Sequence, residues 1–176
     1  MTKHQINTGT IWITGVTASG KTTLGRALYN RLLQQYSPEQ IEFLDGEMLR
    51  EKLKKDSGRT VDERFARLKD VVKLAKKHYD QEKIVIVSAI SYKKEMRAFA
   101  RSKMPHFMEV YLNCSIEVCS KRDYKDHYRC AFAGEYETFI GVTHEYEVSD
   151  TPELILNTGT QSIEECSEIL YEQAKI

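Results

Sequence analysis

Short apolar runs alternate along this chain with longer segments whose apolar residues recur every three or four positions. The runs have the length and composition of buried strands and cover residues 11–14, 41–45, 84–88, 108–112 and 154–156. In the segments 65–79 and 163–170, the apolar residues fall on one face of a helix. Strands and helices that alternate in this way predict an α/β fold with a mostly parallel sheet and helices on both faces.

A glycine-rich loop follows the first apolar run. Residues 15–22 read Gly-Val-Thr-Ala-Ser-Gly-Lys-Thr and fit the P-loop pattern G-x-x-x-x-G-K-S/T, directly before a helical segment. In such a loop the backbone N–H groups wrap around phosphate oxygens, and the helix N-terminus adds a favourable dipole. Lys21 would add positive charge at the β- and γ-phosphates, and Thr22 a hydroxyl for Mg²⁺. The alternative, a glycine turn that happens to carry a lysine, leaves unexplained why a helix begins at that lysine.

Length and charge restrict the classes of partner. The 176 residues are enough for one domain with a full core. The 26 lysines and arginines balance the 26 aspartates and glutamates, which argues against a nucleic acid polymer as partner but leaves room for a small nucleotide. The first residues lack the apolar segment of a signal peptide, and no run approaches the roughly 18 apolar residues of a membrane span. We therefore expect no membrane partner and a cytoplasmic protein.

The second predicted strand ends in two carboxylates, in the sequence Asp45-Gly46-Glu47. In parallel sheets ligands bind at the carboxyl ends of the strands, so both side chains would face the ligand crevice. Phosphoryl transfer needs a carboxylate for Mg²⁺ and a group that accepts the proton of the attacking hydroxyl. Asp45 and Glu47 are therefore candidate catalytic residues, and Asp45 a candidate metal ligand beside Thr22. The alternative for Glu47 is that it only complements the dipole of the next helix.

A group of arginines follows these carboxylates, at Arg50, Arg59, Arg64 and Arg67. Guanidinium groups bind phosphate-like oxyanions through paired donors, which makes the group a candidate substrate-binding site. For any single member the alternative is a solvated helix face, because acidic residues interleave with the arginines.

Segment 123–147 breaks the alternation of strands and helices. It is polar and charged, with scattered aromatics and glycines. A polar stretch this long inside a compact domain is either functional or disordered, and its aromatics argue against disorder. We predict a mobile lid over the nucleotide site, from which Lys125 would reach the transferring phosphoryl group as a catalytic cation. The residues that we assign to ATP are Gly15, Ala18, Ser19, Gly20, Lys21, Thr22, Thr23 and, just before the lid, Arg122.

Taken together, these motifs resemble the adenylylsulfate (APS) kinase family over residues 9–170. Residues 15–22 are similar to the family's P-loop, and residues 45–50 to its Asp-Gly-Asp-Asn-x-Arg stretch. Residues 63–68 are similar to its Asp-Arg-x-x-Asn-Ile block, residues 90–92 to its Ile-Ser-Pro turn, and residues 119–147 to its lid. The resemblance implies a P-loop kinase. We predict a five-stranded parallel sheet in the order 2-3-1-4-5, with residues 1–176 in a single domain.

The resemblance also implies an activity and roles for individual residues. Such enzymes use MgATP to phosphorylate the ribose 3′-hydroxyl of APS, and they commonly form homodimers. By position, Lys21 and Thr22 would serve ATP and Mg²⁺, while Asp45 and Glu47 would orient the metal and the 3′-hydroxyl. On the acceptor side, Arg50 and Arg64 would bind the phosphosulfate, and Ile90 and Ser91 would touch the substrate through their backbone. Phe139 would stack on the base of the substrate, and Lys125 would act from the lid.

The chain departs from the family pattern mainly at acceptor positions. Arg59 replaces a second aromatic that sandwiches the adenine, and Arg67 replaces an asparagine that contacts the substrate. The other departures are Glu47-Met48 in place of Asp-Asn, Tyr92 in place of a proline, and Asp126-His127 in place of Gly-Leu in the lid. Loss of one stacking face would weaken purine binding, since base–aromatic stacking is worth about 1–3 kcal/mol per base. Arg59 would compensate in part by stacking itself.

Several acceptors and one non-catalytic role therefore stay open. The acceptor is either APS or a cytidine conjugate such as cytidine diphosphoramidate, the substrate of a divergent branch of the family that serves capsule decoration. The further alternatives are a P-loop kinase for another small acceptor and a non-catalytic sensor that binds ATP.

Overall fold

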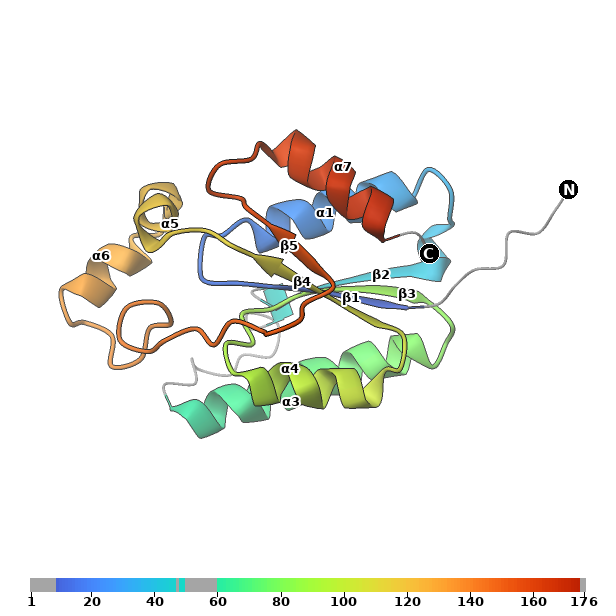
Figure 1. Ribbon diagram of the computed structural model, residues 1–176. Helices are drawn as coiled ribbons and strands as arrows, with labels where there is room; N and C mark the ends of the chain where they lie inside the picture. Colours follow the sequence, from blue (N-terminus) through green and yellow to red (C-terminus); the bar gives the residue numbers. More distant parts are fainter. Residues whose placement is uncertain (1–8, 47, 50–59, 175–176) are drawn as a thin grey trace, which may run out of the picture.

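Five parallel strands form one sheet in the order β2-β3-β1-β4-β5 (Figure 1). A computed structural model of the chain describes residues 9–46, 48–49 and 60–174. The strands are β1 (Thr10–Thr14), β2 (Ile41–Asp45), β3 (Ile84–Ser88), β4 (Phe107–Leu112) and β5 (Leu154–Leu156). The predicted fold class and strand order are confirmed, and β1 and β4 each begin one residue before the predicted runs.

Helices cover both faces of the sheet. The helical elements between the strands are α1 (Lys21–Leu32), η1 (Pro38–Gln40), α3 (Val61–Tyr79), α4 (Lys94–Lys103), α5 (Ile116–Arg122) and α6 (His127–Phe132). Helix α7 (Ile163–Gln173) follows β5. Helices α1 and α7 lie on one face and α3 and α4 on the other, whereas α5 and α6 extend beyond the end of the sheet (Figure 1). Among the described residues, no helix has the length and apolar character needed to cross a membrane.

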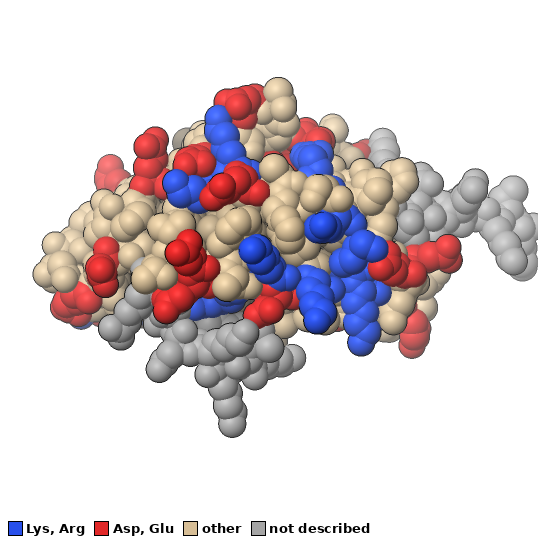
Figure 2. Space-filling view, turned by 90° about the horizontal axis from the view of Figure 1, so that it is seen from below, with Lys and Arg blue, Asp and Glu red and all other residues tan. Residues whose placement is uncertain are grey.

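Both faces of the central strands are buried, which explains why the runs are continuously apolar rather than alternating. Ile11 and Ile13 of β1 pack in the core layer that includes residues of α1 and α7. Trp12, between them, points the other way and packs in the layer that includes α3 and α4. The outer surface of α3 and α4 carries basic side chains over part of its area, bordered by acidic ones (Figure 2). This charged surface is the side of α3 and α4 that faces solvent.

Gly25 allows α1 to approach β2 closely. A Cβ atom at this position would lie 2.6 Å from Cε2 and 2.9 Å from Cζ of Phe43. We expect Gly25→Ala to lower the free energy of unfolding by about 1–3 kcal/mol, because the half-buried Phe43 ring packs against the core and must shift. Urea unfolding measures this, with Asn30→Ala on the exposed face of α1 as the control. A Gly25→Ala protein that gains stability, as helix propensity alone favours, would contradict the prediction.

Candidate active site

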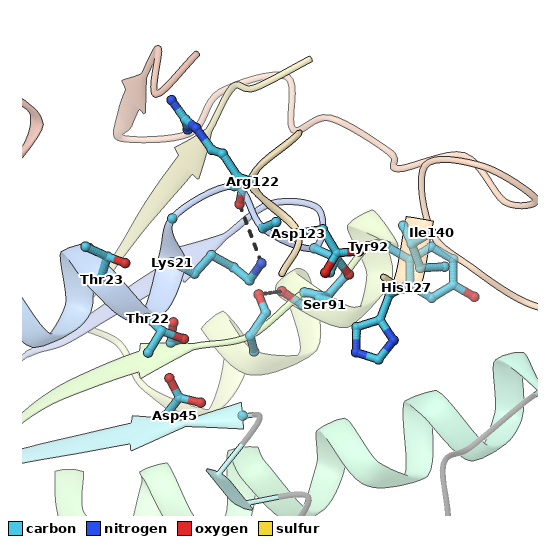
Figure 3. Close-up of a pocket in the computed structure, with 18 of the residues that line it drawn as sticks. Lys21, Thr22, Thr23, Asp45, Ser91, Tyr92, Arg122, Asp123, His127 and Ile140 are labelled. Atoms are coloured by element: carbon cyan, nitrogen blue, oxygen red, sulfur yellow. Dashed lines mark hydrogen bonds between the residues drawn. The ribbon is translucent and has the colours of Figure 1, made fainter. Parts of the chain in front are cut away.

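A cavity of about 1440 Å³ lies at the carboxyl ends of the strands, between the P-loop and the segment predicted as a lid. Single-ligand pockets usually measure about 300–1,000 Å³, so this cavity has room for two nucleotide-sized ligands. Figure 3 shows Lys21, Thr22 and Asp45 toward one end of it. Ser91, Tyr92 and His127 lie toward the other end (Figure 3).

The P-loop has the backbone geometry of an anion site. Gly15, Ala18 and Gly20 have φ angles of 151°, 58° and 102°. At Gly15 a Cβ atom would lie 2.9 Å from Ser19 Oγ, so only glycine fits there. Helix α1 begins at Lys21 without a side-chain cap on its first turn. The residues of that turn border the cavity, and the dipole of the helix favours phosphate at its N-terminus.

Lys21 and the neighbouring segments hold the loop in shape. Lys21 Nζ donates to the carbonyl oxygen of Val16 at 2.6 Å, across the loop. The Thr158 hydroxyl donates to the carbonyl of Ser19 at 2.8 Å, from the turn after β5. These bonds connect the P-loop to its own lysine and to the turn after the last strand.

The predicted lid also contacts the P-loop. The hydroxyl of Tyr128, in α6, donates to the carbonyl oxygen of Thr17 at 2.9 Å. Burial raises the pKa of Tyr128 well above its usual range, so its phenol stays protonated and donates at neutral pH. The loop and the segment that begins at 123 are therefore joined by a hydrogen bond that does not titrate near neutrality.

The two predicted metal ligands lie together. Figure 3 shows Thr22 of α1 just above Asp45 of β2. Asp45 is buried at the end of β2 and pairs in register with Ser88 at the end of β3. Among the described residues, no hydrogen-bond partner reaches the buried Ser88 hydroxyl, which also borders the cavity. Oxygen donors gathered in this way fit Mg²⁺, while Glu47 lies outside the described residues.

Two of the four predicted arginines reach the cavity. Arg64 and Arg67 border it from α3, whereas Arg50 and Arg59 lie outside the described residues. Arg64 Nη2 donates to the carbonyl oxygen of Thr138 at 2.8 Å, next to Phe139. Helix α3 is thereby joined to the segment that carries the predicted base-stacking ring.

The backbone at Ile90 and Ser91 is held from several sides. Ser91 has a φ angle of 35°, in the left-handed region that is uncommon for a residue with a side chain. The Thr14 hydroxyl donates to the carbonyl of Ile90 at 2.6 Å, and the Trp12 indole N–H donates to Ser91 Oγ at 3.0 Å. Arg97 Nη1 donates to the carbonyl of Ser91 at 2.7 Å. Strained backbone held in this way is typical of ligand sites.

Phe139 lies in an aromatic cluster at the edge of the cavity. The Tyr136 ring stacks on it with centroids 5.8 Å apart and an interplanar angle of 12°. The Tyr128 ring meets it edge-on at 4.9 Å. Lys125 and Arg122 also border the cavity, and Arg122 lies above Lys21 in Figure 3. The structure thus places every described site candidate except Gly15 along one cavity. Gly15 is the first residue of the P-loop.

Several residues that border the cavity were missed by the reasoning from sequence. Besides Ser88 they include residues of the β5–α7 turn and the start of α7: Thr158, Gln161, Ser162 and Ile163. The sequence does contain a signal for them, because Ser88 ends a predicted strand and the other four residues follow one. The same criterion selected Asp45.

Comparisons with known proteins agree with this geometry. A family model described as adenylylsulphate kinase matches residues 7–157. The adenylyl-sulfate kinase of Bacillus licheniformis is 37% identical over 175 residues, which are 98% of this chain and 88% of that protein. That of Vibrio vulnificus is 38% identical over 165 residues, 93% of this chain and 79% of that one. The APS kinase of Mycobacterium tuberculosis, solved in complex with AMPPNP and APS, is similar with a TM-score of 0.87 and 30% identity over 96% of this chain and 98% of that chain.

Proposed function

Because the chain belongs to the adenylylsulphate kinase family, we propose that it transfers the γ-phosphoryl group of ATP to the ribose 3′-hydroxyl of a nucleotide 5′-conjugate. The observation that carries this proposal is the single cavity bordered both by the P-loop and by the Ile90–Ser91 backbone and Phe139. A donor and an acceptor nucleotide bound in it would share one enclosed space. Proximity of this kind turns a bimolecular transfer into an effectively unimolecular step.

At the donor end, the P-loop amides and Lys21 would bind the β- and γ-phosphates of ATP. Thr22 and Asp45 would hold Mg²⁺, which when bound offsets the negative charge of the phosphates. Asp45, with Glu47, would also orient the 3′-hydroxyl for in-line attack. Lys125, which borders the cavity from the lid segment, would add positive charge at the transferring group as the lid closes.

At the acceptor end, the arginines would bind the charged 5′-conjugate through paired guanidinium donors. Arg64 and Arg67 border the cavity, and Arg50 and Arg59 join them in this proposal. The Ile90 and Ser91 backbone would contact the acceptor, and Phe139 would stack on its base. We further propose one domain, a homodimer and a cytoplasmic location.

We propose APS as the acceptor, on the strength of the relatives named above. A cytidine conjugate such as cytidine diphosphoramidate is the second candidate. What favours it is the departure at Arg59, where the family pattern has an aromatic, and the replacement of an asparagine by Arg67. Both changes fall on the acceptor side, while the P-loop is intact.

The test measures ADP release from MgATP with APS and with cytidine diphosphoramidate, each over a range of concentrations. The phosphorylated carbon of the product is located by NMR. We expect turnover with APS and phosphate on the 3′-oxygen. Turnover of the cytidine conjugate alone would identify the second candidate. Tight ATP binding without ADP release that depends on either conjugate would reject the proposal and favour another small acceptor or the non-catalytic sensor.

A further inference from the structure

Tyr92 borders the cavity at its acceptor end, and its hydroxyl is buried. Tyr92 follows Ser91 in the loop between β3 and α4, its residue is 2% exposed, and it borders the cavity. Within the described part of the chain, the Tyr92 hydroxyl has no hydrogen-bond partner. Figure 3 places Tyr92 beside Ser91 and on the same side of the cavity as His127.

Such a hydroxyl is costly to the free protein. A buried polar group without a partner loses its hydration and gains nothing in exchange, whereas a phenylalanine would fill the same space without that cost. Native proteins pair most such groups, and an exception calls for an explanation. A ligand that enters the cavity and accepts a hydrogen bond provides one.

Two other buried tyrosines near the carboxyl ends of the strands show the contrast. The Tyr146 hydroxyl bonds with Thr14 Oγ1 at 2.7 Å. The Tyr128 hydroxyl donates to the carbonyl of Thr17 at 2.9 Å. Both therefore stabilise the protein by themselves, which leaves Tyr92 as the one of these three hydroxyls that the described residues do not satisfy.

Other residues at the acceptor end of the cavity also carry polar groups. His127 Nδ1 lies 3.0 Å from the Tyr136 hydroxyl, and the Tyr136 ring stacks on Phe139. All three residues border the cavity. An acceptor whose base lies near Phe139 would therefore be within the same compartment as the Tyr92 phenol.

We propose that Tyr92 is a specificity-determining residue for the acceptor, whose phenol O–H donates a hydrogen bond to an oxygen or nitrogen of the bound nucleotide conjugate. This inference rests on the proposed function, since it names a contact within the same site. A polar group that is satisfied only by the correct ligand discriminates strongly, because a ligand that lacks the partner leaves it buried and unpaired.

The test compares Tyr92→Phe with the wild type in steady-state kinetics on whichever conjugate the wild type phosphorylates. We expect kcat/KM for the acceptor to fall about 10-fold or more, since a lost buried hydrogen bond has that size. The KM for ATP stays unchanged, and the midpoint of urea unfolding without ligands stays equal or rises. Tyr29→Phe is the matched control, because it removes a hydroxyl from a ring that packs on Phe43 away from the cavity.

Three outcomes overturn the inference. Unchanged acceptor kinetics in Tyr92→Phe would show that the hydroxyl does not contact the substrate. A lower unfolding midpoint with proportionate losses for ATP and acceptor would show that the hydroxyl has a structural partner. Wild-type protein that phosphorylates neither conjugate would overturn the proposed function and this inference with it. In the first two outcomes the wild type is active, so a failure of the inference alone can be told from a failure of the proposed function.

Discussion

Lys21→Met is expected to lower kcat about 1,000-fold while the protein stays folded. Methionine keeps most of the length of the side chain but removes the positive charge that would face the β- and γ-phosphates. Charge that develops on the transferring group is stabilised mostly by fixed donors and cations, and loss of one such group costs about 100- to 100,000-fold in comparable sites. The measurement is ADP release at saturating MgATP and acceptor.

The structure indicates how to separate this effect from unfolding. Lys21 Nζ bonds to the carbonyl of Val16, so the substitution also removes a contact within the loop. Thermal unfolding of the variant should therefore be recorded beside its kinetics. Lys121→Met serves as the matched control, since this lysine is 71% exposed on α5 and pairs with Glu117 on its own helix. Normal turnover in Lys21→Met would show that the P-loop assignment is wrong.

The donor half of the site could be predicted because its residues are contiguous. One stretch of eight residues contains the glycines, the lysine and the threonine, and the strand before it and the helix after it follow from local patterns. Asp45 was also found, because parallel strands bring their carboxyl ends to one edge of the sheet. Ser91 was indicated only by the resemblance to the family's Ile-Ser-Pro turn. Topology of this simple kind needs no knowledge of side-chain packing.

The supporting residues could not be predicted, because their partners are set by tertiary structure. Glu109 interrupts the fourth apolar run, and Arg97 reads as part of a charged helix. Each alone is typical of a solvated position. In the structure they form an ion pair in the core, with Arg97 2% exposed and Arg97 Nε 2.9 Å from Glu109 Oε1. Nothing local to either residue indicates the other across twelve positions of chain.

This pair links the acceptor loop to the segment at the end of the lid, residues 147–149. Besides Glu109, Arg97 binds the carbonyl oxygens of Ser91 and Glu147. Ser149, in the same segment, bonds to the Glu109 carboxylate and accepts from Arg97 Nε at 3.0 Å. One guanidinium group therefore satisfies acceptors on two segments that are more than 50 residues apart, a role that needs its planar set of five donors.

Arg97→Met is expected to lower the free energy of unfolding by about 3–5 kcal/mol, because it leaves the Glu109 carboxylate buried without its charge partner. Urea unfolding measures the loss. Arg31→Met is the control, since its pair with Glu168 is exposed at 41% and 54% of the two side chains and such pairs contribute about 0–1 kcal/mol.

The double variant Arg97→Met/Glu109→Leu separates the cost of an unpaired charge from the loss of positioning. Removal of both charges should recover much of the stability, because apolar residues of similar volume replace buried ion pairs at little cost. It should not recover acceptor kcat/KM, because the carbonyls of Ser91 and Glu147 would still lack their donor. If Arg97→Met costs no more than Arg31→Met, the pair is not buried as described. If the double variant regains full acceptor kinetics, Arg97 does not position Ser91 for the acceptor.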